Sequence, residues 1–261
     1  MGRHGPYPTG TFITDAHGRD KEVAEIMKDS VVNSRLKVLG VMLAIAGLAF
    51  VAGGGYALYQ TNQGAKALHA FSAAQNVTLS YNEAGQLVDR GETAGSEKIM
   101  SLLTNDWGYQ VVAGDLNPND PVVNTASEYM YQMATIAYHT LHGTTTVVLD
   151  KDVTAADGTV FKAGEYEFAT EGRYWTGFNR ANPIEAAARE QVWTGTAHAL
   201  IAELGVGSVT ASALQIGFGI AALLGGLGLM FIFTGLGLVW ATRGATERVN
   251  VPVLRPAPTL A

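Results

Sequence analysis

The sequence has 261 residues, of which 48% are hydrophobic and only 15% are charged, and its formal net charge is −6. Asp, Glu, Lys and Arg are absent from residues 38–65 and 204–242, a pattern that excludes an ordinary soluble protein and a disordered chain. The acidic balance argues against a nucleic-acid partner, and the lack of cysteine excludes disulfides, thiolate catalysis and cysteine-based metal sites.

The first apolar segment follows a mixed-charge leader, residues 1–37. Residues 38–60 supply the roughly 20 apolar residues that are needed to cross a hydrocarbon layer about 30 Å thick. Tyr56 and Tyr59 near its end suit the headgroup level. A buried helix of a soluble protein and a cleaved signal peptide are the alternatives, but both have shorter apolar runs. We therefore predict a transmembrane helix at 38–60.

The next segment, residues 61–211, is long enough for one compact domain. Helices are expected in its first half at residues 63–75, 96–104 and 121–142. Ser96 is a candidate N-cap for the second of these helices, and Asp120 followed by Pro121 is typical of a helix start. The helix 63–75 continues the first span.

The second half of this segment predicts strands and one more helix. Strands are expected at residues 144–149 and 159–168, on either side of an Asp157-Gly158 turn, with 77–81 as a further candidate. Asn182 is the N-cap and Glu185 the capping-box acid of a helix that extends to about residue 204, where Gly205 and Gly207 are expected to break or bend it. The predicted fold of this segment is a small α+β domain.

The second apolar segment, residues 212–241, predicts another transmembrane helix, followed by a tail at 242–261. Basic residues lie near the outer ends of both spans: Lys28, Arg35, Lys37, Arg243, Arg248 and Arg255. Residues 61–211 instead carry eight Lys and Arg against seventeen Asp and Glu. The positive-inside rule then places both termini in the cytoplasm and 61–211 outside. We predict a plasma-membrane protein in which two transmembrane helices flank an extracytoplasmic α+β domain.

Small residues recur four positions apart in both spans. Gly40 and Ala44 form such a pair in the first span, and Gly217, Ala221 and Gly225 form a longer series in the second. Such spacing makes a flat stripe on which another helix can pack closely. The alternative is the ordinary glycine content of membrane helices. The sequence leaves open whether the packing partner is internal or a second protein.

A polar helix face carries the best candidate for chemistry. Glu128, His139 and His142 share one side of the predicted helix 121–142, and a carboxylate with two imidazoles could bind a metal ion such as zinc or iron. The pattern is not His-Glu-x-x-His, and a further ligand for the pair His139 and His142 would have to come from elsewhere, with His198 or His69 as options. The alternative is a polar face with hydrogen-bonded histidines, which are favoured near a helix C-terminus. The sequence predicts no cofactor apart from this metal candidate.

An aromatic cluster is the second candidate site. Its members are Trp107, Tyr109, Tyr174, Trp175, Phe178 and Trp193. Arg173, Tyr174, Trp175 and Trp193 could form a ligand platform or a docking surface, because aromatic residues and arginine are common at interface centres. The alternative is that the rings form the core of a small domain.

Three segments resemble a family of actinobacterial two-pass membrane proteins: 106–137 (DWGYQVVAGDLNPNDPVVNTASEYMYQMATIA), 138–143 (YHTLHG) and 193–212 (WTGTAHALIAELGVGSVTAS). The resemblance covers most of residues 38–241 and implies an actinobacterial plasma membrane, but it implies no site residues. Some members carry the label aromatic ring-opening dioxygenase. Such an enzyme requires an iron site in a soluble fold, and the sequence contains no motif for that chemistry, so we do not adopt the label.

The function favoured by the sequence is an accessory or structural subunit of a larger plasma-membrane assembly, for which a respiratory complex is one host. Membrane lipid and a protein partner, or a homo-oligomer, are the expected contacts. The sequence does not decide whether the chain is an enzyme, but it favours a non-catalytic role because nucleophile-elbow, phosphate-loop and dinucleotide motifs are absent. An extracytoplasmic sensor that binds a ligand or metal is the alternative, followed by a membrane-anchored metal-dependent enzyme.

Overall fold

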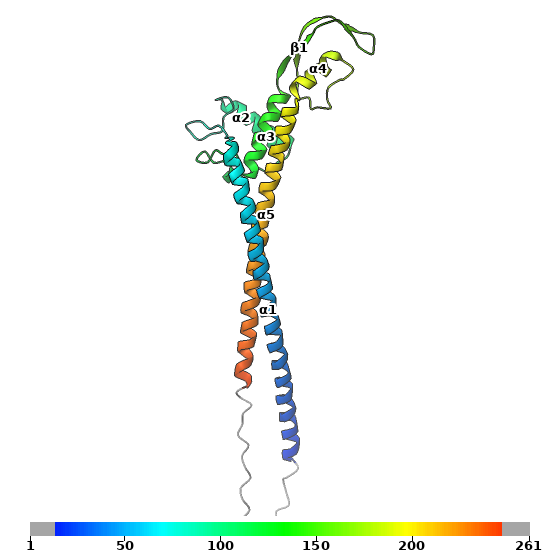
Figure 1. Ribbon diagram of the computed structural model, residues 1–261. Coiled ribbons are helices and arrows are strands. Elements are labelled where there is room, and N and C mark those ends of the chain that lie inside the picture. Colours follow the sequence, from blue (N-terminus) through cyan, green and yellow to red (C-terminus); the bar gives the residue numbers. More distant parts are fainter. Residues whose placement is uncertain (1–13, 247–261) are drawn as a thin grey trace, which may run out of the picture. The chain divides into compact units, whose positions relative to one another are not determined.

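The computed structural model describes the backbone of residues 14–246 and the side chains of most of them (Figure 1). The chain divides into two units. Unit 1 combines residues up to Tyr59 with residues from Gly219 onward, and unit 2 comprises Gln60–Phe218. The outer parts of the predicted cytoplasmic segments 1–37 and 242–261 lie outside the described residues, as do Arg248 and Arg255.

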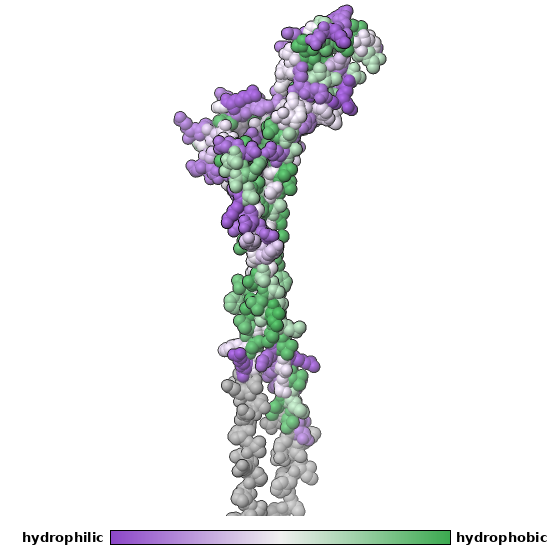
Figure 2. Space-filling model, in the orientation of Figure 1, coloured by the Kyte–Doolittle hydropathy of each residue, from purple (hydrophilic) through white to green (hydrophobic). Residues whose placement is uncertain are grey.

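Two long helices run through both units: α1 (Thr14–Gln75) and α5 (Gly195–Thr246). Neither contains proline, so nothing interrupts the backbone hydrogen bonds within them. Their most apolar windows have mean hydropathies of 2.2 and 2.3, and only 11% of each window is buried within the chain. Both helices are therefore long and apolar enough to cross a membrane. Figure 2 shows a band of hydrophobic side chains around the helix pair, with hydrophilic residues beyond it.

The break that we predicted at Gly205 and Gly207 is wrong, because α5 continues through both glycines. In unit 2 the backbone of Gly207 lies directly against the ring of Tyr129, and a Cβ atom at this position would lie 2.5 Å from Cε1 of the tyrosine. Gly207 thus permits close packing between helices. The mean cost of glycine in a helix, about 1 kcal/mol, is small beside the backbone bonds of a helix this long.

Unit 2 contains three shorter helices between the two long ones. They are α2 (Thr93–Ser101), which continues into the π-helical turn η1 (Leu102–Asp106), then α3 (Ala126–Leu141) and α4 (Pro183–Val192), with a 3-10 turn η2 (Ala113–Asp115) before α3. Ser96 is not the N-cap of α2. Ser96 lies within α2, and its hydroxyl donates hydrogen bonds to the carbonyl oxygens of Leu87 and Thr93.

Helix α3 begins five residues later than Asp120 and Pro121 predicted. Thr125 is its N-cap and forms a capping box with Glu128, in which each side chain accepts from the other residue's backbone N–H. The preceding residues are extended, because Leu79 donates to the carbonyl oxygen of Pro121. A reciprocal pair of capping bonds satisfies two free N–H groups, whereas Asp120 alone could satisfy one.

The strands form two short antiparallel sheets of two strands each. Strand β1 (Thr144–Leu149) pairs along its length with β4 (Gly164–Ala169), and β2 (Val153–Thr154) pairs with β3 (Val160–Phe161). The prediction of a strand at 144–149 and of the Asp157-Gly158 turn is confirmed, since Gly158 has a positive φ of 85°. The candidate strand 77–81 does not join these sheets, and Thr78 instead bridges to Val122.

The core of unit 2 consists of two clusters of buried residues that meet different parts of α3. One cluster contains Leu79, Ile99, Leu103, Val123, Ala126, Tyr129, Tyr131, Ala134, Leu204 and Ala211. The other contains Leu102, Ala137, Leu141, Val147, Phe178, Ile184, Ala188 and Trp193. The N-terminal part of α3, from Ala126 to Ala134, therefore belongs to the cluster with α2 and the long helices, and its C-terminal part, with Ala137 and Leu141, belongs to the cluster with β1 and α4.

Candidate functional site

The two helices of unit 1 are interlocked through glycine. A Cβ atom on Gly40 would lie 2.6 Å from the carbonyl oxygen of Gly235, and one on Gly47 would lie 2.6 Å from that of Gly228. One on Gly54 would lie 3.0 Å from the carbonyl oxygen of Ala221. Real Cβ atoms do not approach backbone this closely, so α1 and α5 pack antiparallel with backbone touching backbone.

The contacts recur every seven residues on both helices: Gly40, Gly47 and Gly54 on α1, and Ala221, Gly228 and Gly235 on α5. A seven-residue repeat keeps one helix face toward its partner along a left-handed pair. We call this contact the glycine seam. Phe50 and Phe231 pack edge to face beside it, with their ring centroids 5.6 Å apart.

The predicted small-residue positions fall differently on this seam. Gly40, Ala44 and Ala221 lie on it, since the backbone of Ala44 contacts Gly235. A Cβ atom at Gly225 would meet no atom within 4 Å, although the backbone nitrogen of Gly225 lies near Gly54. Gly217 belongs to unit 2, where it packs against Thr61. Sequence reasoning missed Gly47, Gly228 and Gly235 because it sought a spacing of four, whereas the packing follows a spacing of seven.

An apolar stripe lies on α1 ahead of the uncharged segment. Val23, Ile26, Met27 and Val31 share one helix face, and each side chain is 45–59% exposed. Ser30 lies among them and donates its hydroxyl to the carbonyl oxygen of Met27. The opposite side of the helix carries charged residues together with the apolar Val32 and Leu36; the charged ones are Lys21, Glu25, Lys28, Asp29 and Arg35. Within the part of the chain that the structure describes, nothing covers this stripe.

The three metal candidates on α3 have separate partners. The carboxylate of Glu128 is only 1% exposed and accepts hydrogen bonds from the backbone of Asn124 and from the backbone and hydroxyl of Thr125. Burial raises the pKa of this carboxyl above its ordinary value, although the hydrogen bonds oppose the rise. Glu128 thus serves as the capping-box acid of α3, whose N-cap is Thr125.

The two histidines also turn to different neighbours. Nε2 of His139 lies 2.9 Å from a carboxylate oxygen of Asp89, while Nδ1 of His142 lies 3.1 Å from the carbonyl oxygen of Tyr138. The structure therefore does not bring Glu128, His139 and His142 together. Among the described residues there is no group of three His, Asp or Glu side chains that could hold a metal ion.

The aromatic platform is a network of internal contacts. Trp193 is buried and stacks on Tyr174, whose hydroxyl accepts a hydrogen bond from Nε1 of Trp107 at 2.8 Å. Trp175 lies under the guanidinium of Arg189, which is 3.7 Å from the ring centroid. Most of these ring faces are thus occupied by other side chains of unit 2.

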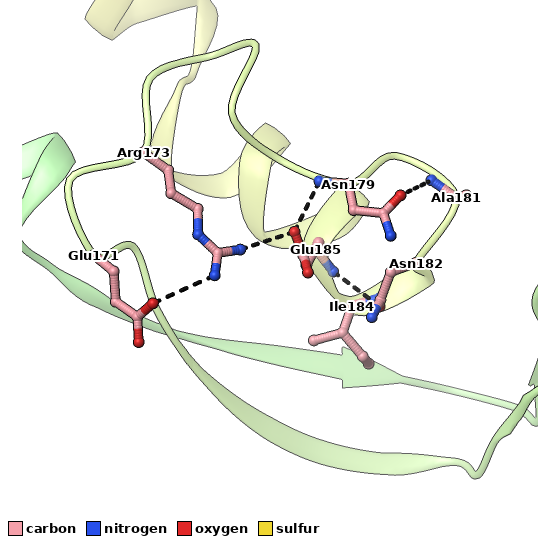
Figure 3. Close-up of polar contacts among 7 residues, drawn as sticks. All are labelled: Glu171, Arg173, Asn179, Ala181, Asn182, Ile184 and Glu185. Atoms are coloured by element: carbon pink, nitrogen blue, oxygen red, sulfur yellow. Dashed lines mark hydrogen bonds and ion pairs between the residues drawn. The ribbon is translucent and has the colours of Figure 1, made fainter.

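Arg173 is held by two carboxylates. Its guanidinium donates to Glu185 at 2.8 Å and to Glu171 at 3.3 Å (Figure 3). The prediction that Asn182 caps α4 is confirmed, because its side chain accepts from the backbone of Ile184 and Glu185. Glu185 is not the reciprocal partner in that cap. It accepts from Arg173 and from the backbone of Asn179 instead.

Unit 2 also contains an apolar groove of about 730 Å³. Three helices contribute to it: α1 with Leu68, Phe71, Ser72 and Gln75, α3 with Tyr129, Gln132 and Ile136, and α5 with seven residues between Leu200 and Thr210. In its wall, the hydroxyls of Ser72 and Tyr129 are hydrogen-bonded to each other at 2.7 Å. Sequence reasoning missed the groove because its three sides are far apart in the chain.

Comparison of the chain with protein-family models, with curated proteins and with solved structures found no match.

Proposed function

We propose that this chain is a non-catalytic subunit of a larger plasma-membrane assembly, anchored by two transmembrane helices. In this proposal unit 2 is an extracytoplasmic α+β domain and both termini are cytoplasmic. The apolar lengths of α1 and α5 support the membrane anchor, and the basic residues beyond the two spans support the orientation. Placement in an actinobacterial membrane rests on the resemblance of the sequence segments and stays a prediction.

The observation that carries the proposal is the uncovered apolar stripe on α1. It lies ahead of residue 38, where charged residues alternate with the apolar ones, so the hydrocarbon layer does not account for it. Fully burying a Val, Ile or Met side chain is worth about 1.5–3 kcal/mol. Four side chains that are about half exposed therefore leave roughly 3–6 kcal/mol of unused burial energy. That amount favours a protein surface as the cover.

The glycine seam changes how such a partner would bind. The sequence left open whether the small-residue stripes pack against a helix of the same chain or of another protein. In the structure, the seam positions of α1 contact α5 of the same chain. A partner would therefore use the stripe and the outward faces of the helices rather than the seam. A second copy of the chain, joined along the stripe, is the homo-oligomeric form of the same proposal.

The test compares two pairs of substitutions on the same helix. Met27→Ser with Val31→Ser disrupts the stripe, while Val32→Ser with Leu36→Ser removes similarly exposed apolar side chains from the opposite side of α1. The full-length protein is extracted in a mild detergent, and its mass and bound proteins are measured by mass spectrometry and light scattering. We expect a stable complex that survives the control pair and is lost with the stripe pair. A monomer without any partner would refute the proposal.

A further inference from the structure

The groove of unit 2 has the size of a small-molecule site. Ligand pockets in proteins occupy about 300–1,000 Å³, and the groove measures about 730 Å³. A methylene group fills about as much space as a water molecule, roughly 30 Å³, so a chain of 16 carbons needs about 480 Å³. The groove is therefore large enough for a hydrocarbon chain of this length.

The charge of the lining restricts the ligand further. Among the residues that the structure describes, no Lys or Arg lines the groove, and Glu203 is the one charged residue in its lining. An anionic headgroup would meet no positive charge and would be repelled by this carboxylate. Gln75 and Gln132 add amide groups that can donate and accept hydrogen bonds. The lining therefore suits an uncharged headgroup with a hydroxyl, which can donate to Glu203.

The helices that line the groove also indicate the source of the ligand. On α5, the lining residues from Leu204 to Thr210 belong to the uncharged segment 204–242. On α1, Leu68 follows the uncharged segment 38–65 by three residues, or about 5 Å of helix. In the proposed membrane orientation, these lining residues adjoin the outer ends of the two spans in the sequence, so the outer leaflet is the nearest source of hydrocarbon chains.

We infer that this groove binds the hydrocarbon chain of a single-chain, uncharged lipid with a hydroxyl headgroup, taken from the outer leaflet. The chain lies along Phe71, Ile136 and Val206, and the headgroup meets Gln75, Gln132 and Glu203. The inference rests on the proposed membrane placement, but it does not depend on the proposed protein partner.

The test uses the full-length protein in lipid nanodiscs and a 16-carbon alcohol that carries a photoreactive diazirine in its chain. After illumination, labelled peptides are identified by mass spectrometry. We expect label on Phe71, Ile136 and Leu200, and competition by unlabelled hexadecanol. Hexadecyl sulfate has the same chain but a permanent negative charge, so it should compete about fivefold less well, and Glu203→Gln should narrow that difference.

Two neighbouring valines of α5 provide a matched pair of variants. Val206 lines the groove and is 67% exposed, while Val209 is 70% exposed and does not line it. Val206→Trp should occupy the groove and lower labelling by about tenfold, and Val209→Trp should leave it within about twofold. Circular dichroism of both variants shows whether they fold.

Two results would overturn the inference. One is equal labelling of the two tryptophan variants, and the other is label that is confined to the transmembrane spans. Failure of the membrane placement would be recognised separately, because the chain would then not enter nanodiscs at all.

Discussion

Adding one methyl group to the glycine seam should weaken the helix pair of unit 1. In Gly47→Ala, the new Cβ would lie 2.6 Å from the carbonyl oxygen of Gly228 and 2.8 Å from the backbone nitrogen of Ile232. Both are backbone atoms of α5, so no side chain can rotate away. The helices must separate by most of an ångström, and a gap of that size forfeits about a quarter to a half of each dispersion contact.

Gly53→Ala is the matched control, because a Cβ atom there would meet no atom within 4 Å. Both variants gain the same helix propensity, up to about 1 kcal/mol. The difference between them therefore isolates the steric effect. Overpacking a tight contact typically costs about 1–3 kcal/mol, so we expect Gly47→Ala to be less stable than Gly53→Ala by this amount.

The assay follows separation of the two helices directly. Because the chain has no cysteine, cysteines introduced at the exposed positions Met42 and Phe233 can be labelled specifically with a fluorescent donor and acceptor. Loss of energy transfer during titration of mild-detergent micelles with SDS gives a free energy of separation. Equal values for Gly47→Ala and Gly53→Ala, within about 0.5 kcal/mol, would refute the seam as the contact that holds α1 to α5.

Three further predictions concern unit 2. Burial raises the pKa of Glu128, so the contribution of this side chain to stability is fully present below the pKa of the unfolded state and is lost as pH rises through the pKa of the native state. Glu128→Gln keeps the capping box and should gain stability relative to the wild type as pH rises between these two pKa values. Denaturant unfolding at pH 4–8 measures this difference. A double-mutant cycle of His139→Ala and Asp89→Asn should show a coupling of about 0.5–3 kcal/mol at pH 6, and additive effects would mean that the 2.9 Å contact is not energetically significant. Asn182→Ala should destabilise unit 2 by about 1 kcal/mol through loss of the α4 cap, whereas unchanged unfolding would show that the cap is dispensable.

Features encoded within a short stretch of sequence were predictable. The strand 144–149 follows from its β-branched residues, and the cap at Asn182 follows from Asn-Pro before a helix. The two apolar segments can be recognised in the sequence because each is a long run without charged residues or proline. In each case the physical signal lies within a few turns of chain.

The start of α3 shows where local signals compete. Asp120-Pro121 and Thr125-x-x-Glu128 are both helix starts in the sequence. Pairing of residues 121–123 with 77–79 holds the first candidate extended, and that pairing is not visible in either segment alone. The contact between His139 and Asp89 was equally unpredictable, because it joins residues 50 positions apart in the chain. It gives His139 a partner outside the predicted metal group.

The groove and the seam were missed for different reasons. The groove requires knowledge of how α1, α3 and α5 pack. The seam was present in the sequence as a repeat of seven, but the search for small residues four apart concealed it.

The glycine seam has a consequence for how the chain tolerates change. Its contacts are made by backbone, so forming them freezes no side-chain rotamers and carries little of that entropy cost. For the same reason, no rotamer change can absorb an added atom. Mutational tolerance along the helix pair should therefore be bimodal: outward positions should accept most apolar residues, while Gly40, Gly47, Gly228 and Gly235 should accept none larger than glycine without displacing a whole helix.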